Sequence, residues 1–113
     1  MKKLFVSLPM AGLTTEEIRN KMIKYKENAE RIMGEKLELI DTTIVEAPNG
    51  VKNCGVWCLG NSIMMMADAD VVYFGDGWRS DRGCIAESMV AYRYKILRIE
   101  DDPYWGIKIE EGY

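Results

Sequence analysis

Residues 69–87 read ADVVYFGDGWRSDRGCIAE, and this stretch decides the fold. It begins with the apolar, largely β-branched and aromatic run Val71–Phe74, loosens into a loop rich in glycine and carboxylates, and continues as a helix that carries Glu87 about one turn in. A strand, a loop and a helix N-terminus in this order are common where α/β proteins bind phosphates or sugars. The stretch therefore predicts one strand of a sheet and the position of a ligand.

Strands and helices alternate along the rest of the chain. The sequence predicts strands at 3–8, 37–40, 71–74 and 96–99, a fifth at 107–109 that lies at an edge or leaves the body, and helices between Thr14 and Gly34, over 62–67 and over 83–94. Thr14 and Glu17 fit a capping box, and Gly34 fits a helix C-cap. The alternation predicts a right-handed, mostly parallel α/β sheet of four to five strands with helices on both faces, hence three layers, in one domain spanning 1–113.

Residues 41–60 have no clear hydrophobic period and contain Pro48-Asn49-Gly50 and two further glycines. We expect this segment to be a loop. A connection of that length in a small domain is more often functional than filler. The alternative is a partly disordered surface loop.

Composition restricts the class of partner. The 113 residues include 15 basic and 18 acidic side chains that are interspersed, for a net charge of −3, which argues against a nucleic-acid polymer as partner. No apolar run approaches the roughly 20 residues that a membrane span needs, and the run at 4–6 ends too early for a signal peptide. We expect a cytoplasmic protein with a small-molecule ligand and no membrane partner.

The chain has three cysteines, Cys54, Cys58 and Cys84, and no histidine. Cys54 and Cys58 could form a metal or redox pair, but three soft ligands without a fourth favour free thiols, so no metal or other cofactor is expected. The lack of histidine removes Ser-His and Cys-His nucleophile systems. Acid–base or nucleophilic chemistry must then come from carboxylates, tyrosines, lysines or thiols.

The predicted topology brings residues 7–12 and 75–87 together, because both segments follow the carboxyl ends of neighbouring strands. Glu87 lies near the start of its helix, where the helix dipole favours an ionised carboxylate. An ionised, positioned carboxylate is what a glycosyl nucleophile requires, and Gly83 leaves space for a ring to approach it. The alternative is that Glu87 is an ordinary surface residue.

Three motifs, Ser7-Leu8-Pro9-Met10-Ala11-Gly12, Ala69-Asp70-Val71-Val72 and Gly77–Glu87, together resemble the nucleoside 2-deoxyribosyltransferase family, and most closely its small bacterial and phage-type branch. The likeness spans roughly residues 3–99. It implies a flavodoxin-like sheet and a homo-oligomer whose sites are completed by a neighbouring subunit. It also implies cleavage of the N-glycosidic bond of a deoxynucleoside or deoxynucleotide, by transfer or hydrolysis.

The resemblance also implies roles for single residues. Glu87 aligns with the nucleophile that attacks the anomeric carbon. Asp81 stands where transferases carry a sugar-site aspartate and where deoxynucleotide hydrolases carry a phosphate-binding serine, which favours a nucleoside, although Ser80 lies beside it. The family's base-contacting aspartate falls on Ser62, next to Asn61, and neither side chain can donate a proton as a carboxylic acid.

Asp76 or Asp81 could take over that proton donation, and Leu8 replaces the family's glycine in the first turn. Trp78 could stack on a base or sugar, or form a hydrophobic lid over the helix. Asp68 and Asp70 lie at the far edge of the sheet and are expected to be structural. The predicted catalytic residues are Glu87 and Asp81, and the predicted substrate-binding residues are Ser7, Pro9, Gly12, Asn61, Ser62, Asp76, Trp78, Ser80 and Gly83.

Two further functions remain open from the sequence. One is a non-catalytic protein that binds nucleotides or nucleotide sugars on the same scaffold, because folds are reused for new roles. Such a protein would not need the carboxylic acid that Ser62 replaces. The other is a purely structural or host-interaction protein, which would neither bind such a ligand nor cleave it. The aromatic tail, with Tyr104, Trp105 and residues 111–113, is expected to pack on a neighbouring subunit.

Overall fold

The computed structural model describes residues 1–42, 46–102 and 106–110. Its elements in chain order are β1 (Lys2–Ser7), α1 (Thr15–Met33), β2 (Leu37–Leu39), α2 (Cys54–Met66), β3 (Val71–Phe74), the 3₁₀ helix η1 (Trp78–Ser80), α3 (Arg82–Arg93), β4 (Leu97–Asp102) and β5 (Gly106–Glu110). The tail residues Tyr104, Trp105 and 111–113, for which we expected a subunit contact, lie outside the described residues.

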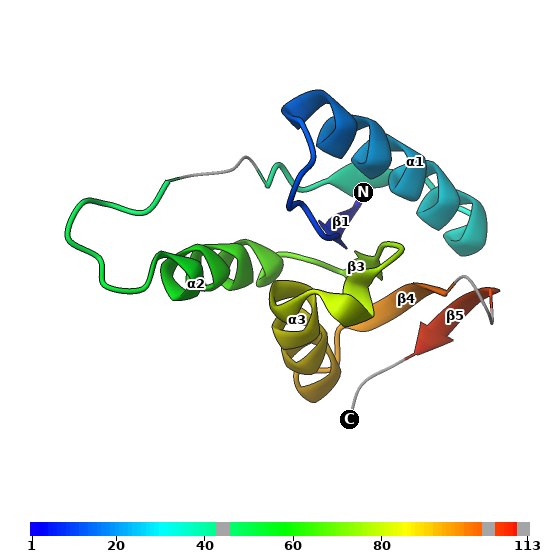
Figure 1. Ribbon diagram of the computed structural model, residues 1–113. Helices are drawn as coiled ribbons and strands as arrows, with labels where there is room; N and C mark the ends of the chain where they lie inside the picture. The colour runs from blue at the N-terminus through cyan, green and yellow to red at the C-terminus, as the bar shows by residue number, and fades with distance from the viewer. Residues whose placement is uncertain (43–45, 103–105, 111–113) are drawn as a thin grey trace.

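The five strands form one sheet in the order β2-β1-β3-β4-β5 (Figure 1). The first four are parallel, and β5 runs antiparallel to β4, with Ile99 opposite Ile109. This is the strand order of flavodoxin-like folds. The mostly parallel sheet and the edge strand near 107–109 are thereby confirmed.

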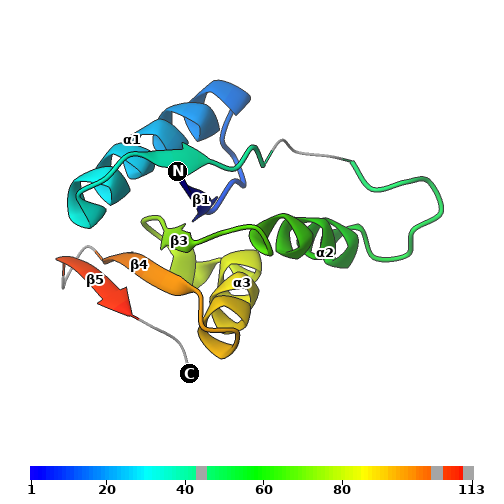
Figure 2. The same ribbon diagram turned by 180° about the vertical axis from the view of Figure 1, so that it is seen from behind.

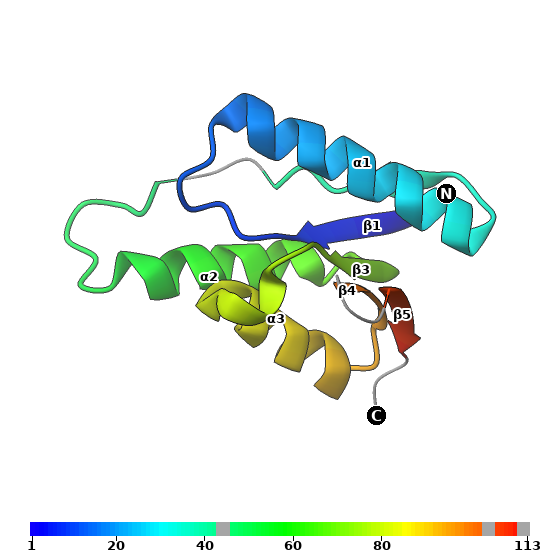
Figure 3. The ribbon, with the colours of Figure 1, turned by 45° about the vertical axis from the view of Figure 1, so that its right-hand side comes forward.

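Helices cover both faces of the sheet, so the molecule has three layers (Figure 3). Side chains alternate along a strand. Leu4 and Val6 of β1 therefore pack under α1, whereas Phe5 packs in the second core, on the side of α3. All four residues of β3 are buried, as expected for a central parallel strand with a helix layer on each face.

α1 begins and ends where the sequence predicts. The Thr14 Oγ accepts a hydrogen bond from the Glu17 backbone N–H at 3.1 Å, and the Glu17 carboxylate accepts one from the Thr14 N–H at 3.2 Å. Gly34 has a φ of 71° and donates its N–H to the carbonyl of Glu30 at 2.9 Å. The capping box and the glycine C-cap are both confirmed.

The prediction for α2 is wrong at its start. The helix begins at Cys54, eight residues before the expected start at 62, and the long loop therefore ends at Asn53 (Figure 2). The Asn53 side chain caps the helix by accepting from the Val56 N–H at 3.0 Å. Gly55 and Gly60 lower the helix propensity of the segment, and it has no pattern of charged side chains that would mark a helix. The sequence therefore gives no clear signal for the first two turns of α2.

The remaining boundaries differ only slightly from the predictions. α3 starts one residue earlier than expected, at Arg82, and β4 runs on to Asp102. Asp70 accepts a hydrogen bond from the Lys3 backbone N–H at 2.7 Å, which agrees with a structural role at the far edge of the sheet. In the described part of the chain, no helix is both long enough and apolar enough to cross a membrane.

Candidate functional site

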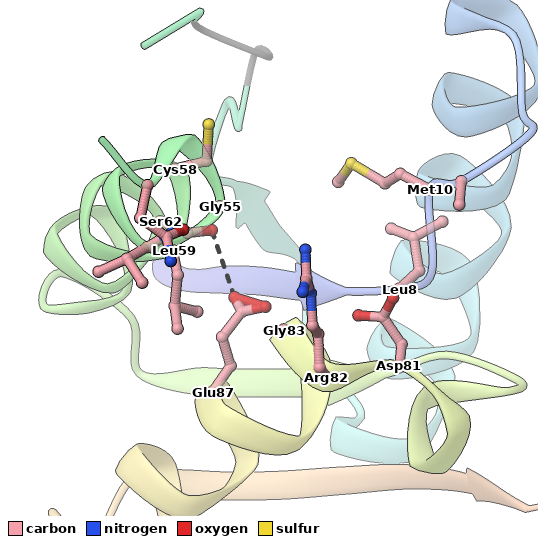
Figure 4. A pocket seen from close by; sticks show the side chains of 13 residues that line it. Leu8, Met10, Gly55, Cys58, Leu59, Ser62, Asp81, Arg82, Gly83 and Glu87 are labelled. Atoms are coloured by element: carbon pink, nitrogen blue, oxygen red, sulfur yellow. Dashed lines mark hydrogen bonds between the residues drawn. The ribbon is translucent and has the colours of Figure 1, made fainter. Parts of the chain in front are cut away.

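A pocket lies beside the carboxyl ends of β1 and β3, where chain connections leave for opposite faces of the sheet. α/β proteins bind ligands at such a switch point. The pocket has a volume of about 440 Å³ and is bounded by the β1–α1 loop, α2 and α3 (Figure 4). The residues labelled there are Leu8, Met10, Gly55, Cys58, Leu59, Ser62, Asp81, Arg82, Gly83 and Glu87.

A second pocket of about 280 Å³ adjoins the first. Its walls include Phe5, Thr42, Asn61 and Met65. The two pockets share five residues: Leu8, Met10, Cys58, Ser62 and Glu87. Glu87 therefore stands between two spaces that could hold different parts of one ligand.

Glu87 is 7% exposed, and hydroxyl groups hold both of its carboxylate oxygens. Ser7, the last residue of β1, donates from its Oγ to Oε1 at 3.3 Å. Ser62 of α2 donates to Oε2 at the same distance, as the dashed line in Figure 4 marks. The two serines come from different elements, so three parts of the fold converge on this carboxylate.

Burial raises the pKa of Glu87 to about 7. The hydrogen bonds from Ser7 and Ser62 oppose the rise, and the charge of Asp81 adds to it. Burial thus opposes the helix dipole, which we expected to favour the ionised carboxylate. Glu87 is the sixth residue of α3. It lies beyond the first turn, where the helix dipole acts most strongly, and desolvation dominates.

Asp81 lines the larger pocket and also caps α3. Its Oδ2 accepts a hydrogen bond from the Cys84 backbone N–H at 2.9 Å. A capping carboxylate is held in a fixed orientation at the helix start. The structure thus brings both predicted catalytic residues, Asp81 and Glu87, to one pocket, and Asp81 has a structural role as well.

The structure also brings together four of the predicted substrate-binding residues. Ser7 and Asn61 line the smaller pocket, Gly83 lines the larger one, and Ser62 lines both. Ser62 holds Glu87 in place of the acid that the family resemblance led us to expect.

Five other predicted substrate-binding residues lie outside the residues that line these two pockets: Pro9, Gly12, Asp76, Trp78 and Ser80. Trp78 is buried in the second core, where its ring centroid lies 5.2 Å from that of Phe74. This burial agrees with the alternative in which Trp78 packs as a hydrophobic lid and not with stacking on a ligand. Asp76 is exposed, and its backbone N–H donates to the Tyr25 hydroxyl at 3.1 Å.

Sequence reasoning missed the wall formed by α2 and the cation formed by Arg82. The side chain of Arg82 reaches from α3 toward α2, and its Nη2 lies 3.3 Å from where a Cβ on Gly55 would stand. An asparagine followed three residues later by apolar side chains, as at Asn53, was the available signal for the first turn of α2.

None of the cysteines of the described chain forms a disulfide. Cys54 and Cys58 are exposed on α2, whereas Cys84 is buried and its burial raises the thiol pKa to about 12. Among the described residues, no three His, Cys, Asp or Glu side chains form a group that could hold a metal ion.

Comparisons with protein-family models, with curated proteins and with solved structures find no match for this chain. A function for the site has to be argued from its own chemistry.

Proposed function

We propose that the protein cleaves the N-glycosidic bond of a 2-deoxynucleoside or deoxynucleotide through a covalent intermediate on Glu87. The observation that carries the proposal is the placement of Glu87, a buried carboxylate held by two serine hydroxyls between two adjoining pockets. One pocket would hold the sugar and the other the base. The motif likeness to nucleoside 2-deoxyribosyltransferases points to the same bond.

The reaction is a double displacement. A carboxylate oxygen of ionised Glu87 attacks the anomeric carbon, the carbon–nitrogen bond breaks, and its electron pair leaves with the base, which takes a proton from water. Water or a second base then attacks the same carbon and releases Glu87. Because the carbon is inverted twice, the product retains the anomeric configuration.

Asp81 is assigned to the sugar rather than to proton donation. Its Oδ2 holds the Cys84 N–H, so its other oxygen is the one available to accept a hydrogen bond from a sugar hydroxyl. Ser62 replaces the expected acid and supplies a hydroxyl to Glu87. Departure of the base is therefore less assisted than in an enzyme with a carboxylic acid at that position.

The same replacement supports a second candidate, a non-catalytic binder of nucleotides or nucleotide sugars. A neutral serine at position 62 and a Glu87 whose pKa is raised by burial suit recognition of a sugar without bond cleavage. Binding without turnover would identify this alternative.

We infer further that a second copy of the chain packs on α2. Val56, Gly60, Met64 and Ala67 recur at intervals of four, four and three residues, so they share one helix face, and all four are exposed. The helix has no charged residue between 54 and 66 and borders the pocket, so a symmetric contact would bring no like-charged side chains of α2 together and would cover the pocket's outer side. The reduced thiols of Cys54 and Cys58 on α2 are in keeping with a cytoplasmic location.

The test uses a panel of deoxynucleosides and their 5′-monophosphates, each with and without a free base. Chromatography would measure base release and exchange, and mass spectrometry of the acid-quenched protein would measure the sugar adduct on Glu87. We expect Glu87→Ala and Glu87→Gln to lower turnover by about a thousandfold or more. In the wild type, turnover should rise with pH through about 7, because the nucleophile must be ionised.

Glu27→Gln, which changes an exposed glutamate of α1, is the matched control and should leave turnover unchanged. Equal turnover by the wild type and both Glu87 variants would exclude Glu87 as the nucleophile. A thermal shift with nucleotides but no turnover would replace the enzyme proposal with the binder.

A further inference from the structure

A pair of buried charges lies on β4, behind the pocket. Arg98 is 5% exposed and Glu100 is 3% exposed. They are two residues apart on a strand, so both side chains point to the same face. The Arg98 Nη2 donates to the Glu100 Oε1 at 2.5 Å.

This pair also makes one contact at each end of the segment that carries the site. The Arg98 Nη1 donates to the backbone carbonyl of Ser88 at 3.0 Å, and Ser88 directly follows Glu87. The Glu100 Oε2 accepts from the Arg79 Nη2 at 3.1 Å. Arg79 lies in η1, two residues before Asp81. Both ends of the 79–88 segment are thus tied to β4.

Aromatic rings enclose the Arg98 guanidinium. Its central carbon lies 5.0 Å from the ring centroid of Phe74, 5.8 Å from that of Trp78 and 5.9 Å from that of Tyr92. Arg79 lies over the Trp78 ring as well, at 5.2 Å. Trp78, for which the sequence left open a stacking role or a lid over the helix, therefore lies against two arginines of the network.

Stability alone is a weak reason for such an arrangement. A buried ion pair loses hydration, and well-packed apolar side chains are often as stable or more so. The Nε of Arg98 is buried without a hydrogen-bond partner among the described residues, which adds to the cost. The carbonyl of Ser88 lies inside α3, where helix geometry already supplies a backbone N–H that donates to it. The extra donor from Arg98 instead fixes where α3 sits on the sheet.

We propose that Arg98, Glu100 and Arg79 are positioning residues, which hold α3 and η1 on β4 so that Glu87 and Asp81 face the same pocket. The inference rests on the proposed function for the chemical role of Glu87. The placement of the Glu87 carboxylate itself can be measured without any substrate.

Exact placement matters because the hydrogen bonds to Glu87 are long. Each serine oxygen lies 3.3 Å from a carboxylate oxygen, and hydroxyl hydrogen bonds are usually nearer 2.7–2.8 Å. A small shift or rotation of α3 would break both bonds and let water reach the carboxylate. Misplacement by about 1 Å can cost a reaction on the order of a hundredfold.

The experiment compares Arg79→Gln with Arg93→Gln. Both replace an exposed arginine by the same amide, but only Arg79 contacts Glu100. Glu100→Gln and Arg98→Lys test the buried members, and Arg79→Lys tests rescue because a lysine can still donate to Glu100. Carbon-13 NMR would follow titration of the Glu87 carboxyl, with Glu87→Gln assigning its signal, and thermal unfolding would follow stability.

We expect Arg79→Gln to unfold within a few degrees of the wild type, while the titration midpoint of Glu87 falls from near 7 toward the ordinary range of a hydrated carboxyl. Arg79→Lys and Arg93→Gln should keep the wild-type midpoint. If Arg79→Gln keeps it too, and the folded Glu100 and Arg98 variants change only in stability, the positioning role is overturned.

Arg79→Gln leaves the buried pair intact, so the test does not depend on the folding of the other two variants. A shifted midpoint in a protein that cleaves no glycosidic bond would support positioning and reject the proposed function. An unshifted midpoint together with Glu87-dependent cleavage would do the reverse.

Discussion

At the scale of one residue, the protonated form of Glu87 stabilises the fold, whereas the proposed reaction needs its ionised form. Its pKa is raised from 4.5 to about 7 by burial, so the folded protein binds this proton more tightly than the unfolded chain does. The contribution to stability is full below about 4.5 and is lost as the pH rises through about 7. A shift of this size corresponds to about 3 kcal/mol at most. Ionising the nucleophile therefore costs stability in the pH range where the reaction needs it.

Glu87→Gln tests this conflict, because the amide is neutral at every pH. We expect the variant to match the wild type within about 1 kcal/mol at pH 5 and to be more stable by about 2–3 kcal/mol at pH 8. Urea unfolding at the two pH values measures the difference, with Glu27→Gln as the control for loss of an exposed charge. A stability difference that does not change with pH would contradict the raised pKa.

Gly75 illustrates a residue that is required for packing. A Cβ at this position would stand 2.4 Å from Cε2 of Tyr25, which is 3% exposed and stacked on Tyr73 with centroids 4.9 Å apart. We expect Gly75→Ala to lower the free energy of unfolding by about 2–3 kcal/mol, because the stacked ring has no space to move into.

A double-mutant cycle isolates that clash. In a Tyr25→Leu background, which removes the edge of the ring, Gly75→Ala should cost at most about half as much by urea unfolding. Equal costs in the two backgrounds would mean that Gly75 is needed for another reason.

At the scale of elements, the central ones could be predicted because their signals are local. β3 is a run of four apolar residues, and α1 has its capping box and its periodic face of Ile18, Met22 and Tyr25. α2 lacks both signals. Only Met66 is buried among its 13 residues, so the helix has no buried face that would give the sequence a period of apolar residues. Two glycines also lower its helix propensity.

The same difference decides how much of the site could be predicted. Glu87, Asp81 and Gly83 belong to one contiguous motif after β3, and the strand order places Ser7 beside it. The α2 wall and the network through Arg98 and Glu100 depend on contacts between residues far apart in the chain. No spacing in the sequence records such contacts, because tertiary packing alone creates them.

At the scale of the whole molecule, large apolar side chains remain exposed mainly on the α2 and α3 layer. Val56 is 63% exposed, Met64 74% and Met89 59%. Exposed apolar side chains that gather on one layer are typical of a protein–protein contact. Together with the uncharged sequence of α2, they favour a symmetric dimer built on the stripe of Val56, Gly60, Met64 and Ala67.

Met64→Glu tests the dimer, because it places a charge against its own copy at the centre of the contact. We expect light scattering to give twice the chain mass for the wild type at micromolar concentration and the single-chain mass for the variant. Ile23→Glu is the matched control, since Ile23 is also exposed, at 46%, but lies on α1 in the opposite layer and should leave the dimer intact. A monomeric wild type, or a Met64→Glu protein that still dimerises, would show that this stripe has no role in self-association.

If the dimer forms and the stripe covers the outer side of the pocket, Met64→Glu should also weaken nucleoside binding. The titration of Glu87 should stay unchanged in this variant, because α3 and β4 keep their own contacts.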